Sequence, residues 1–127
     1  MLIAKSKIND KETGWFVNIR LYDTKKALQR GTNTKGIAGL YRPNGYVIYP
    51  KRIVRSLLGT ISLCQEYLGA GLISHEVFHA SMDYAHKRYN VASVRTSSSE
   101  RQEDIAYFHG HIVKEICNWL NDKKLWK

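Results

Sequence analysis

The segment from residue 72 to about residue 87 constrains the fold of this 127-residue chain more than any other. Apolar side chains cover most of its circumference when it is wound as a helix, and such a helix has to be buried. One largely polar stripe interrupts this surface. Its members are Leu72, His75, Glu76, His79, Met82, Asp83 and His86. A polar stripe on a buried helix requires a specific role for its side chains.

The centre of the stripe reads His75-Glu-Val-Phe-His79, an HExxH motif. Residues four apart on a helix share one face, so both imidazoles can reach one metal ion. Glu76 lies at the flank of the stripe, where it can contact a metal-bound water as a general base without being a ligand. Two histidines and a carboxylate would leave one position on Zn²⁺ open for that water. The alternative is a pair of helical histidines that bind no metal.

The rest of the chain predicts a single α+β domain, residues 1–127, with strands first and helices after. Strands are expected at residues 2–8, 15–22, 37–41, 46–49 and 60–67, with a hairpin turn at residues 42–45. A short helix is expected at residues 24–29, with Asp23 as its cap and Gly31 at its end. The sheet should be mainly antiparallel and should carry two long helices.

The second long helix is expected from about residue 99 to residue 120. Two capping boxes fit its start, Ser97 with Glu100 and Ser99 with Gln102. Its core face consists of Ile105, Phe108, Ile112, Val113, Ile116, Trp119 and Leu120. This amphipathic pattern indicates that the helix packs against the sheet and the first long helix.

A third metal ligand has to come from outside the motif, and the second helix offers Glu100, Glu103 and Asp104. Glu100 is engaged in a predicted capping box, and Asp104 points further into the polar side of the helix. Glu103 borders Gly110, whose missing side chain would let the two helices approach closely. We therefore expect Glu103 to be the third ligand. A solvated surface glutamate is the alternative.

The segment His75-Glu-Val-Phe-His-Ala80, followed 24 residues after His79 by Glu103-Asp-Ile-Ala-Tyr107, resembles the gluzincin metallopeptidases. It is particularly similar to short metallopeptidase-like proteins of phages and bacteria. The resemblance implies a zincin-like fold, with a small twisted sheet over the HExxH helix. It also implies one Zn²⁺ per chain, held by His75, His79 and Glu103, and hydrolysis of peptide bonds with Glu76 as the base.

The same resemblance implies that an edge strand, here residues 60–67, binds an extended peptide substrate by β-augmentation. In the larger gluzincins an aspartate orients a zinc-binding histidine, and Tyr107 occupies its place here. Their oxyanion-stabilising residue lies in a downstream domain. The candidates for that role in this sequence are Tyr84, Tyr107, His109 and His111.

The chain carries 20 Lys and Arg against 11 Asp and Glu, a formal net charge of +9. This charge is compatible with nucleic-acid binding, but the basic residues are scattered and no block of five or more like charges occurs. A basic module that binds nucleic acid or a host protein, with a structural or vestigial zinc site, is therefore the alternative to a peptidase. Glu76 favours the peptidase, because a structural site needs no base.

The sequence also carries features that bear on location. The first seven residues are too short and too charged for a signal peptide. No segment approaches the ~18–20 apolar residues of a membrane span, so no membrane partner is expected. The two cysteines, Cys64 and Cys117, do not form a disulfide framework. We expect free thiols and a cytoplasmic location, in a bacterium or a phage-infected host cell.

Overall fold

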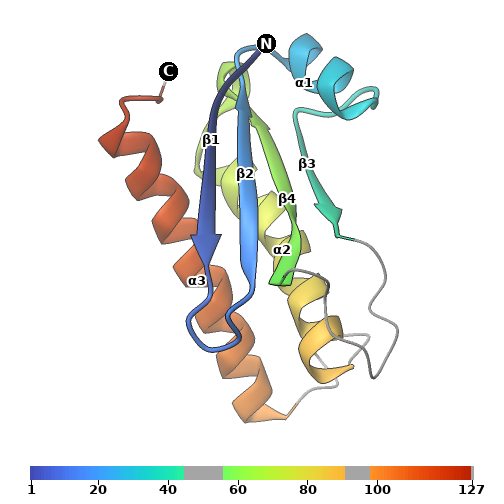
Figure 1. Cartoon of the computed structure of the whole chain (residues 1–127), viewed down its shortest axis with the longest axis vertical. Coiled ribbons are helices and arrows are strands. Elements are labelled where there is room, and N and C mark those ends of the chain that lie inside the picture. Colours follow the sequence, from blue (N-terminus) through green and yellow to red (C-terminus); the bar gives the residue numbers. More distant parts are fainter. Residues whose placement is uncertain (45–55, 91–97, 127) are drawn as a thin grey trace.

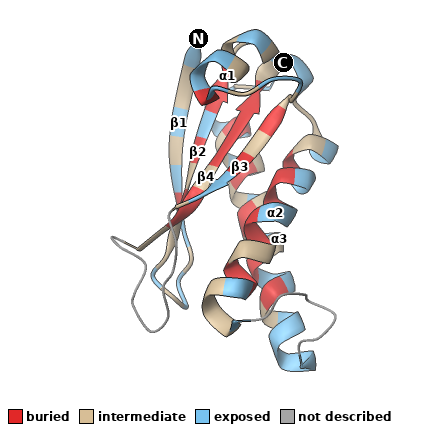
Figure 2. Ribbon diagram, turned by 90° about the vertical axis from the view of Figure 1, so that its right-hand side faces the viewer, coloured by how far each residue is buried: buried red, intermediate tan, exposed pale blue. Residues whose placement is uncertain are grey.

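The computed structural model describes residues 1–44, 56–90 and 98–126 of the chain, and it is α+β as predicted. The elements in chain order are β1 (Leu2–Asn9), β2 (Phe16–Tyr22), α1 (Lys25–Thr32), β3 (Gly39–Pro43), β4 (Leu57–Cys64), the short 3₁₀ helix η2 (Gln65–Tyr67), α2 (Ala70–Tyr89) and α3 (Ser99–Asp122). The strand expected at residues 46–49 lies outside the described residues. The two long helices pack on one face of the sheet (Figures 1 and 2).

The four described strands form one mixed sheet in the order β1-β2-β4-β3. The β1/β2 and β3/β4 pairs are antiparallel, whereas β2 and β4 are parallel. The parallel pair arises because the chain passes through α1 and β3 between β2 and β4, which gives it room for the crossover that a parallel pair needs. The expected antiparallel hairpin between the first two strands is confirmed.

The expectation of an edge strand at residues 60–67 is wrong. The strand runs from Leu57 to Cys64, and its last expected residues form the 3₁₀ helix η2. β4 lies between β2 and β3, so its backbone is hydrogen-bonded on both sides and cannot pair with a peptide. Its nearly continuous burial is typical of an inner strand. Among the described strands, β1 and β3 form the edges of the sheet.

The main core lies between the sheet and the two long helices. Alternate residues of β2, namely Val17, Ile19 and Leu21, are at most 1% exposed and contribute to it. Tyr84 of α2 stacks on Phe108 of α3, with ring centroids 4.1 Å apart and an interplanar angle of 9°. The predicted core face of α3 is confirmed: its members are buried, apart from Val113 and Trp119, which are half-buried against the core.

The short helix α1 has boundaries that differ from the expected ones. Its cap is Thr24, whose side-chain oxygen accepts a hydrogen bond from the Ala27 backbone N–H at 3.1 Å. The helix continues through Gly31 and ends at Asn33, which has a left-handed conformation with φ 55°. Gly31 lies inside the helix, at a position where a Cβ atom would come within 2.6 Å of the Tyr22 ring. The absence of a side chain at Gly31 thus allows the Tyr22 ring to pack against the helix, and it does not end the helix.

The start of α3 also differs from the expected capping boxes. The side chain of Ser98 caps the helix and accepts a hydrogen bond from the Arg101 backbone N–H at 3.3 Å. Each serine of the run at residues 97–99 can cap a helix, so residue type alone does not select one of them. Glu100 therefore lies in the first turn of α3 and is exposed.

In the described part of the chain, no helix is long and apolar enough to cross a membrane.

Candidate metal centre

The orientation of α2 determines where its histidines point. Tyr84 is completely buried and packs on Phe108 of α3. His75 precedes Tyr84 by nine residues, which corresponds to a rotation of about 180° around a helix. His75 and His79 therefore lie on the side of α2 that faces away from α3, and both are exposed. The neighbouring element on that side is β3.

The two histidines of the HExxH motif converge as predicted. Their Nε2 atoms are 3.2 Å apart, and their rings meet edge to face with an interplanar angle of 83°. Two nitrogen ligands of a tetrahedral zinc ion, each about 2.05 Å from the metal, are separated by about 3.3 Å. The observed separation of the Nε2 atoms thus fits a shared zinc ion without a change in the backbone.

Glu76 completes the cluster from a buried position. The ligand atoms of His75, Glu76 and His79 all lie within 4.8 Å of one another, and Glu76 is only 5% exposed. Burial raises the pKa of the Glu76 carboxyl. The positive charge of the two histidines and a hydrogen bond from the Tyr41 backbone N–H act in the opposite direction. The carboxylate is thus held next to the histidines in a partly desolvated position.

The cluster opens into a pocket of about 390 Å³ between α2 and β3. Gly39 of β3 lines this pocket and makes room for the carboxylate. A Cβ atom at Gly39 would lie 3.0 Å from Glu76 Oε2 and 2.8 Å from Leu72 Cδ1. An isolated glycine within a strand pattern indicates a close approach of another group, so the sequence carried a signal that our interpretation did not use. Gly39 and Tyr41 together position Glu76 from the side of the sheet.

A second group of polar side chains joins α2 to the sheet one turn beyond His79. The Tyr41 hydroxyl donates to Asp83 Oδ2 at 2.6 Å, and Lys87 Nζ donates to the same oxygen at 2.9 Å. Lys87 Nζ also donates to the Leu58 carbonyl at 3.0 Å, and the Lys87 side chain is only 3% exposed. These contacts fix the orientation of α2 relative to β3 and β4. Tyr41 and Lys87 were not among the expected site residues.

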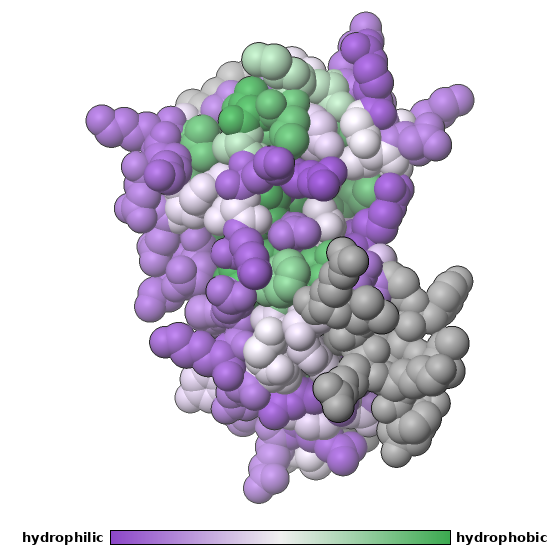
Figure 3. All heavy atoms as spheres, in the orientation of Figure 1, coloured by the Kyte–Doolittle hydropathy of each residue, from purple (hydrophilic) through white to green (hydrophobic). Residues whose placement is uncertain are grey.

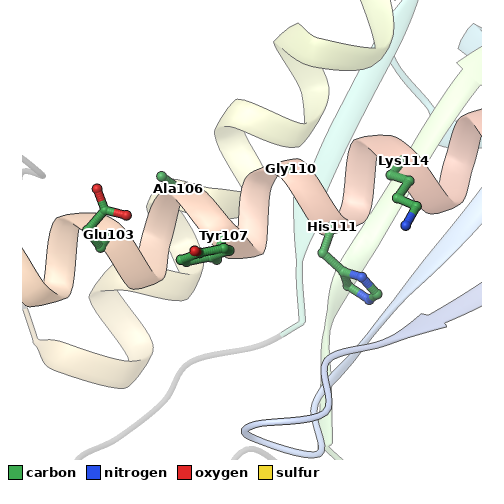
Figure 4. Close-up of a pocket in the computed structure, with 6 residues that line it drawn as sticks. All are labelled: Glu103, Ala106, Tyr107, Gly110, His111 and Lys114. Atoms are coloured by element: carbon green, nitrogen blue, oxygen red, sulfur yellow. The ribbon is translucent and has the colours of Figure 1, made fainter.

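Glu103, the expected third ligand, lies elsewhere in the structure. It is exposed and lines a surface hollow of about 390 Å³ whose six lining residues all belong to α3 (Figure 4). Among the described residues, the group that could hold a metal ion contains His75, Glu76 and His79 but not Glu103. The reason is the rotation of α2, whose histidines face away from α3.

The expected close approach of the two helices at Gly110 is wrong. Gly110 is exposed, and a Cβ atom there would meet no described atom within 4 Å. Besides the stacking of Tyr84 on Phe108, the helices contact each other through Asp104, which accepts hydrogen bonds from the Tyr84 hydroxyl at 2.8 Å and from Arg88 at 2.7 Å. Asp104 therefore holds α2 and α3 together, and it too lies outside the group that could hold a metal ion.

The four expected oxyanion donors all lie on or against α3. The Tyr84 hydroxyl is engaged with Asp104, and His111 Nε2 lies 2.9 Å from the Asn9 carbonyl oxygen. Tyr107 is 75% exposed and lines the hollow on α3, and His109 is half-buried on the same helix. None of them lines the pocket that contains the histidine pair.

Comparison of the chain with protein-family models gives no match, and neither the curated proteins nor the solved structures include a significant one. The assignment of a function therefore depends on the geometry of the site. The zincin-like fold remains a prediction from the sequence.

Proposed function

We propose that the chain is a zinc-dependent peptidase with a zincin-like fold, in which His75 and His79 bind the metal and Glu76 is the general base. The observation that carries this proposal is the 3.2 Å separation of the two Nε2 atoms next to a buried carboxylate. A hydrogen bond between two neutral imidazoles would also bring the nitrogens this close, but it would not explain the buried carboxylate beside them. A glutamate without a specific role is normally exposed to solvent, whereas Glu76 is buried.

The residues of the site fit the requirements of hydrolysis. Zinc would act as a Lewis acid towards the scissile carbonyl and would lower the pKa of a coordinated water to about 7. Glu76 is placed to accept the proton of that water and to return it to the leaving amine. Burial by itself raises the pKa of the Glu76 carboxyl, and a general base is most effective when its pKa lies near the working pH. The Tyr41 backbone N–H keeps the carboxylate in place.

The pocket indicates where a substrate would lie. It is bounded by α2 and β3, and β3 is an edge of the described sheet. We therefore place a peptide substrate along β3, in the pocket that contains the histidine pair, and not along β4. The free thiols of Cys64 and Cys117 support a reducing compartment, which fits the proposed cytoplasmic location.

The role of Glu103 as third ligand is at present supported by the sequence alone. The structure accounts for two histidine ligands and one nearby carboxylate, and it places Glu103 outside the cluster. Water molecules would occupy the remaining positions of an ion held by His75 and His79 alone.

The proposal is tested by the variant Glu76→Gln. Glutamine keeps the size of the side chain and an oxygen that can accept the Tyr41 N–H, but it cannot take up a proton. We expect the variant to retain bound zinc and to lose peptidase activity by at least ~10²-fold. The assay should use unstructured proteins and fluorogenic peptide libraries. Glu100→Gln is the matched control, because Glu100 is exposed in the first turn of α3.

Two results would contradict the proposal. One is a Glu76→Gln variant that cleaves substrates as fast as the wild type, which would exclude Glu76 as the base. The other is a zinc-loaded wild-type protein that cleaves none of the proteins and peptides, which would exclude a general peptidase.

A further inference from the structure

The charged residues of the described helices and strands are unequally divided between the two layers. The four described strands contain no Asp or Glu but four basic residues, Lys5, Lys7, Arg20 and Arg42. α1 likewise has three basic residues and no acidic one. By contrast, α2 contains two acidic and two basic residues. α3 contains five acidic and two basic residues. The sheet layer is therefore strongly positive and the layer of long helices is not.

The four basic residues of the strands lie on the same face of the sheet. Lys5 pairs with Arg20, and Lys7 pairs with Asn18 in the next row. Asn18 pairs with Thr60, which in turn pairs with Arg42. These positions alternate with the buried residues Val17, Ile19 and Leu21, so their side chains point away from the long helices. We call this surface the basic sheet face.

Among the described residues, only α1 covers part of the basic sheet face. Figure 2 shows α2 and α3 on the opposite side of the sheet, and Figure 3 shows hydrophilic side chains across the middle of the basic sheet face. α1 covers only one end of it, where Leu28 packs against Tyr22 and Cys64. Two hollows lie on the remainder, one of about 390 Å³ beside Lys5 and Arg20 and one of about 220 Å³ beside Arg20 and Arg42.

The arrangement of these charges costs stability in the free protein. Lys5 and Arg20 are directly opposite each other on neighbouring strands, where like charges are destabilising. No carboxylate compensates them within the described strands, and none of the four basic residues forms an ion pair with a described residue. A polyanion on the basic sheet face would remove this repulsion, which is the charge complementarity expected of a binding site.

An aromatic ring extends the basic sheet face into a third row. Phe16 is half-buried, and Lys7 Nζ lies 4.1 Å from the centroid of its ring. Between the basic residues lie the amide of Asn18 and the hydroxyl of Thr60. Such groups can contact the edge of a nucleobase, and an aromatic ring can stack on its face. These contacts require bases that are not paired in a duplex.

We propose that the basic sheet face binds single-stranded nucleic acid. Basic residues two apart on one strand, such as Lys5 and Lys7, are separated by about 6.6 Å along the strand, so they can contact different phosphates. Four strands span about 14 Å, which suits a site of a few nucleotides. Phosphates pair with the four basic side chains, while one base stacks on Phe16. This site is separate from the histidine pair, which lies on the helix layer.

The test is a fluorescence-anisotropy titration with labelled single-stranded DNA and RNA of mixed sequence, at several salt concentrations. The double variant Lys5→Gln/Arg20→Gln should bind at least ~10-fold more weakly than the wild type. Loss of two phosphate contacts should also reduce the slope of log K against log salt by roughly 1.4. The matched control Lys114→Gln/Lys123→Gln removes two exposed basic residues from α3 and its end, and it should change the affinity by less than ~2-fold.

A second variant separates stacking from charge. Phe16→Leu keeps an apolar side chain and should weaken binding by about 5-fold or more without a change in the salt slope. Removal of zinc by a chelator should leave the affinity unchanged. The proposal is overturned if the wild type does not bind at low salt, or if the control variant loses as much affinity as the double variant. It is also overturned if a duplex binds as tightly as the single strand, or if chelation abolishes binding.

Discussion

Glu76 shows how the position of one side chain depends on residues far away in the sequence. Its carboxylate fits next to the histidines only because Gly39 has no side chain, and the Tyr41 backbone N–H holds it there. Both contacts come from β3, about 35 residues earlier in the chain. The convergence of His75 and His79 could be predicted from the sequence, because it depends only on the spacing within one helix.

The placement of Glu103 could not be predicted in the same way, because it depends on the rotation of α2 against α3. In the structure Glu103 is exposed and lies outside the cluster of His75, Glu76 and His79. We therefore expect Glu103→Ala to change zinc affinity by less than ~2-fold, whereas His79→Ala should lower it by at least ~10²-fold, since it removes one of two nitrogen ligands. Competition with a chromophoric zinc chelator measures both affinities. A sharp loss in Glu103→Ala would instead support the third ligand expected from the sequence.

At the level of elements, residue patterns predicted most helices and strands but not their neighbours in space. The apolar run of β4 indicated a strand, yet its place between β2 and β3 depends on the crossover through α1 and β3. The two glycines inside helices illustrate the same limit. Gly31 lies against the Tyr22 ring, whereas Gly110 faces open space. The sequence shows that both residues are glycines, but the atoms that surround each of them could not be predicted from it.

The different surroundings of these two glycines lead to opposite expectations. Gly110→Ala should raise the free energy of unfolding by about 0.5–1 kcal/mol, because alanine favours the helix and meets no described atom within 4 Å. Gly31→Ala should lower it by about 1–3 kcal/mol, because the new methyl group would overlap the Tyr22 ring. Urea unfolding of both variants measures these changes. A destabilising Gly110→Ala would indicate the close helix contact that the sequence suggested.

At the level of the whole molecule, folding separates charges that look scattered in the sequence. The face of the sheet that points away from the long helices is basic, while the acidic residues of those helices lie in the other layer. The alternation within strands predicted which residues share a face, but only the pairing of the strands shows that their basic residues become neighbours. The same assembly buries tyrosines against carboxylates at the contacts of α2 with β3 and α3.

These buried tyrosines make stability sensitive to alkaline pH. Burial, together with the hydrogen bond to Asp83, raises the pKa of Tyr41, and burial with the hydrogen bond to Asp104 raises that of Tyr84. Because the folded-state pKa exceeds the unfolded value of about 10, the stability that each contributes is present below pH 10 and is lost as the pH rises further. The free energy of unfolding should therefore decrease between about pH 10 and about pH 12.

Two variants isolate this effect. Tyr41→Phe removes one ionisable group and should show a smaller decrease over that range, measured by urea unfolding at each pH. The free energy of unfolding of Tyr107→Phe should decrease with pH as much as that of the wild type, because the Tyr107 side chain is 75% exposed and makes no comparable buried contact. Identical pH profiles for Tyr41→Phe and the wild type would contradict this account of the buried hydroxyl.

The binding of zinc by the His75–His79 pair is the central claim, and the metal content of the purified protein tests it most directly. Protein prepared without chelator and dialysed against zinc should contain about one zinc ion per chain by elemental analysis. His75→Ala should contain none above background and should still fold, because His75 is exposed. Wild-type protein that stays free of zinc after dialysis would contradict the claim, as would a His75→Ala variant with the same zinc content as the wild type.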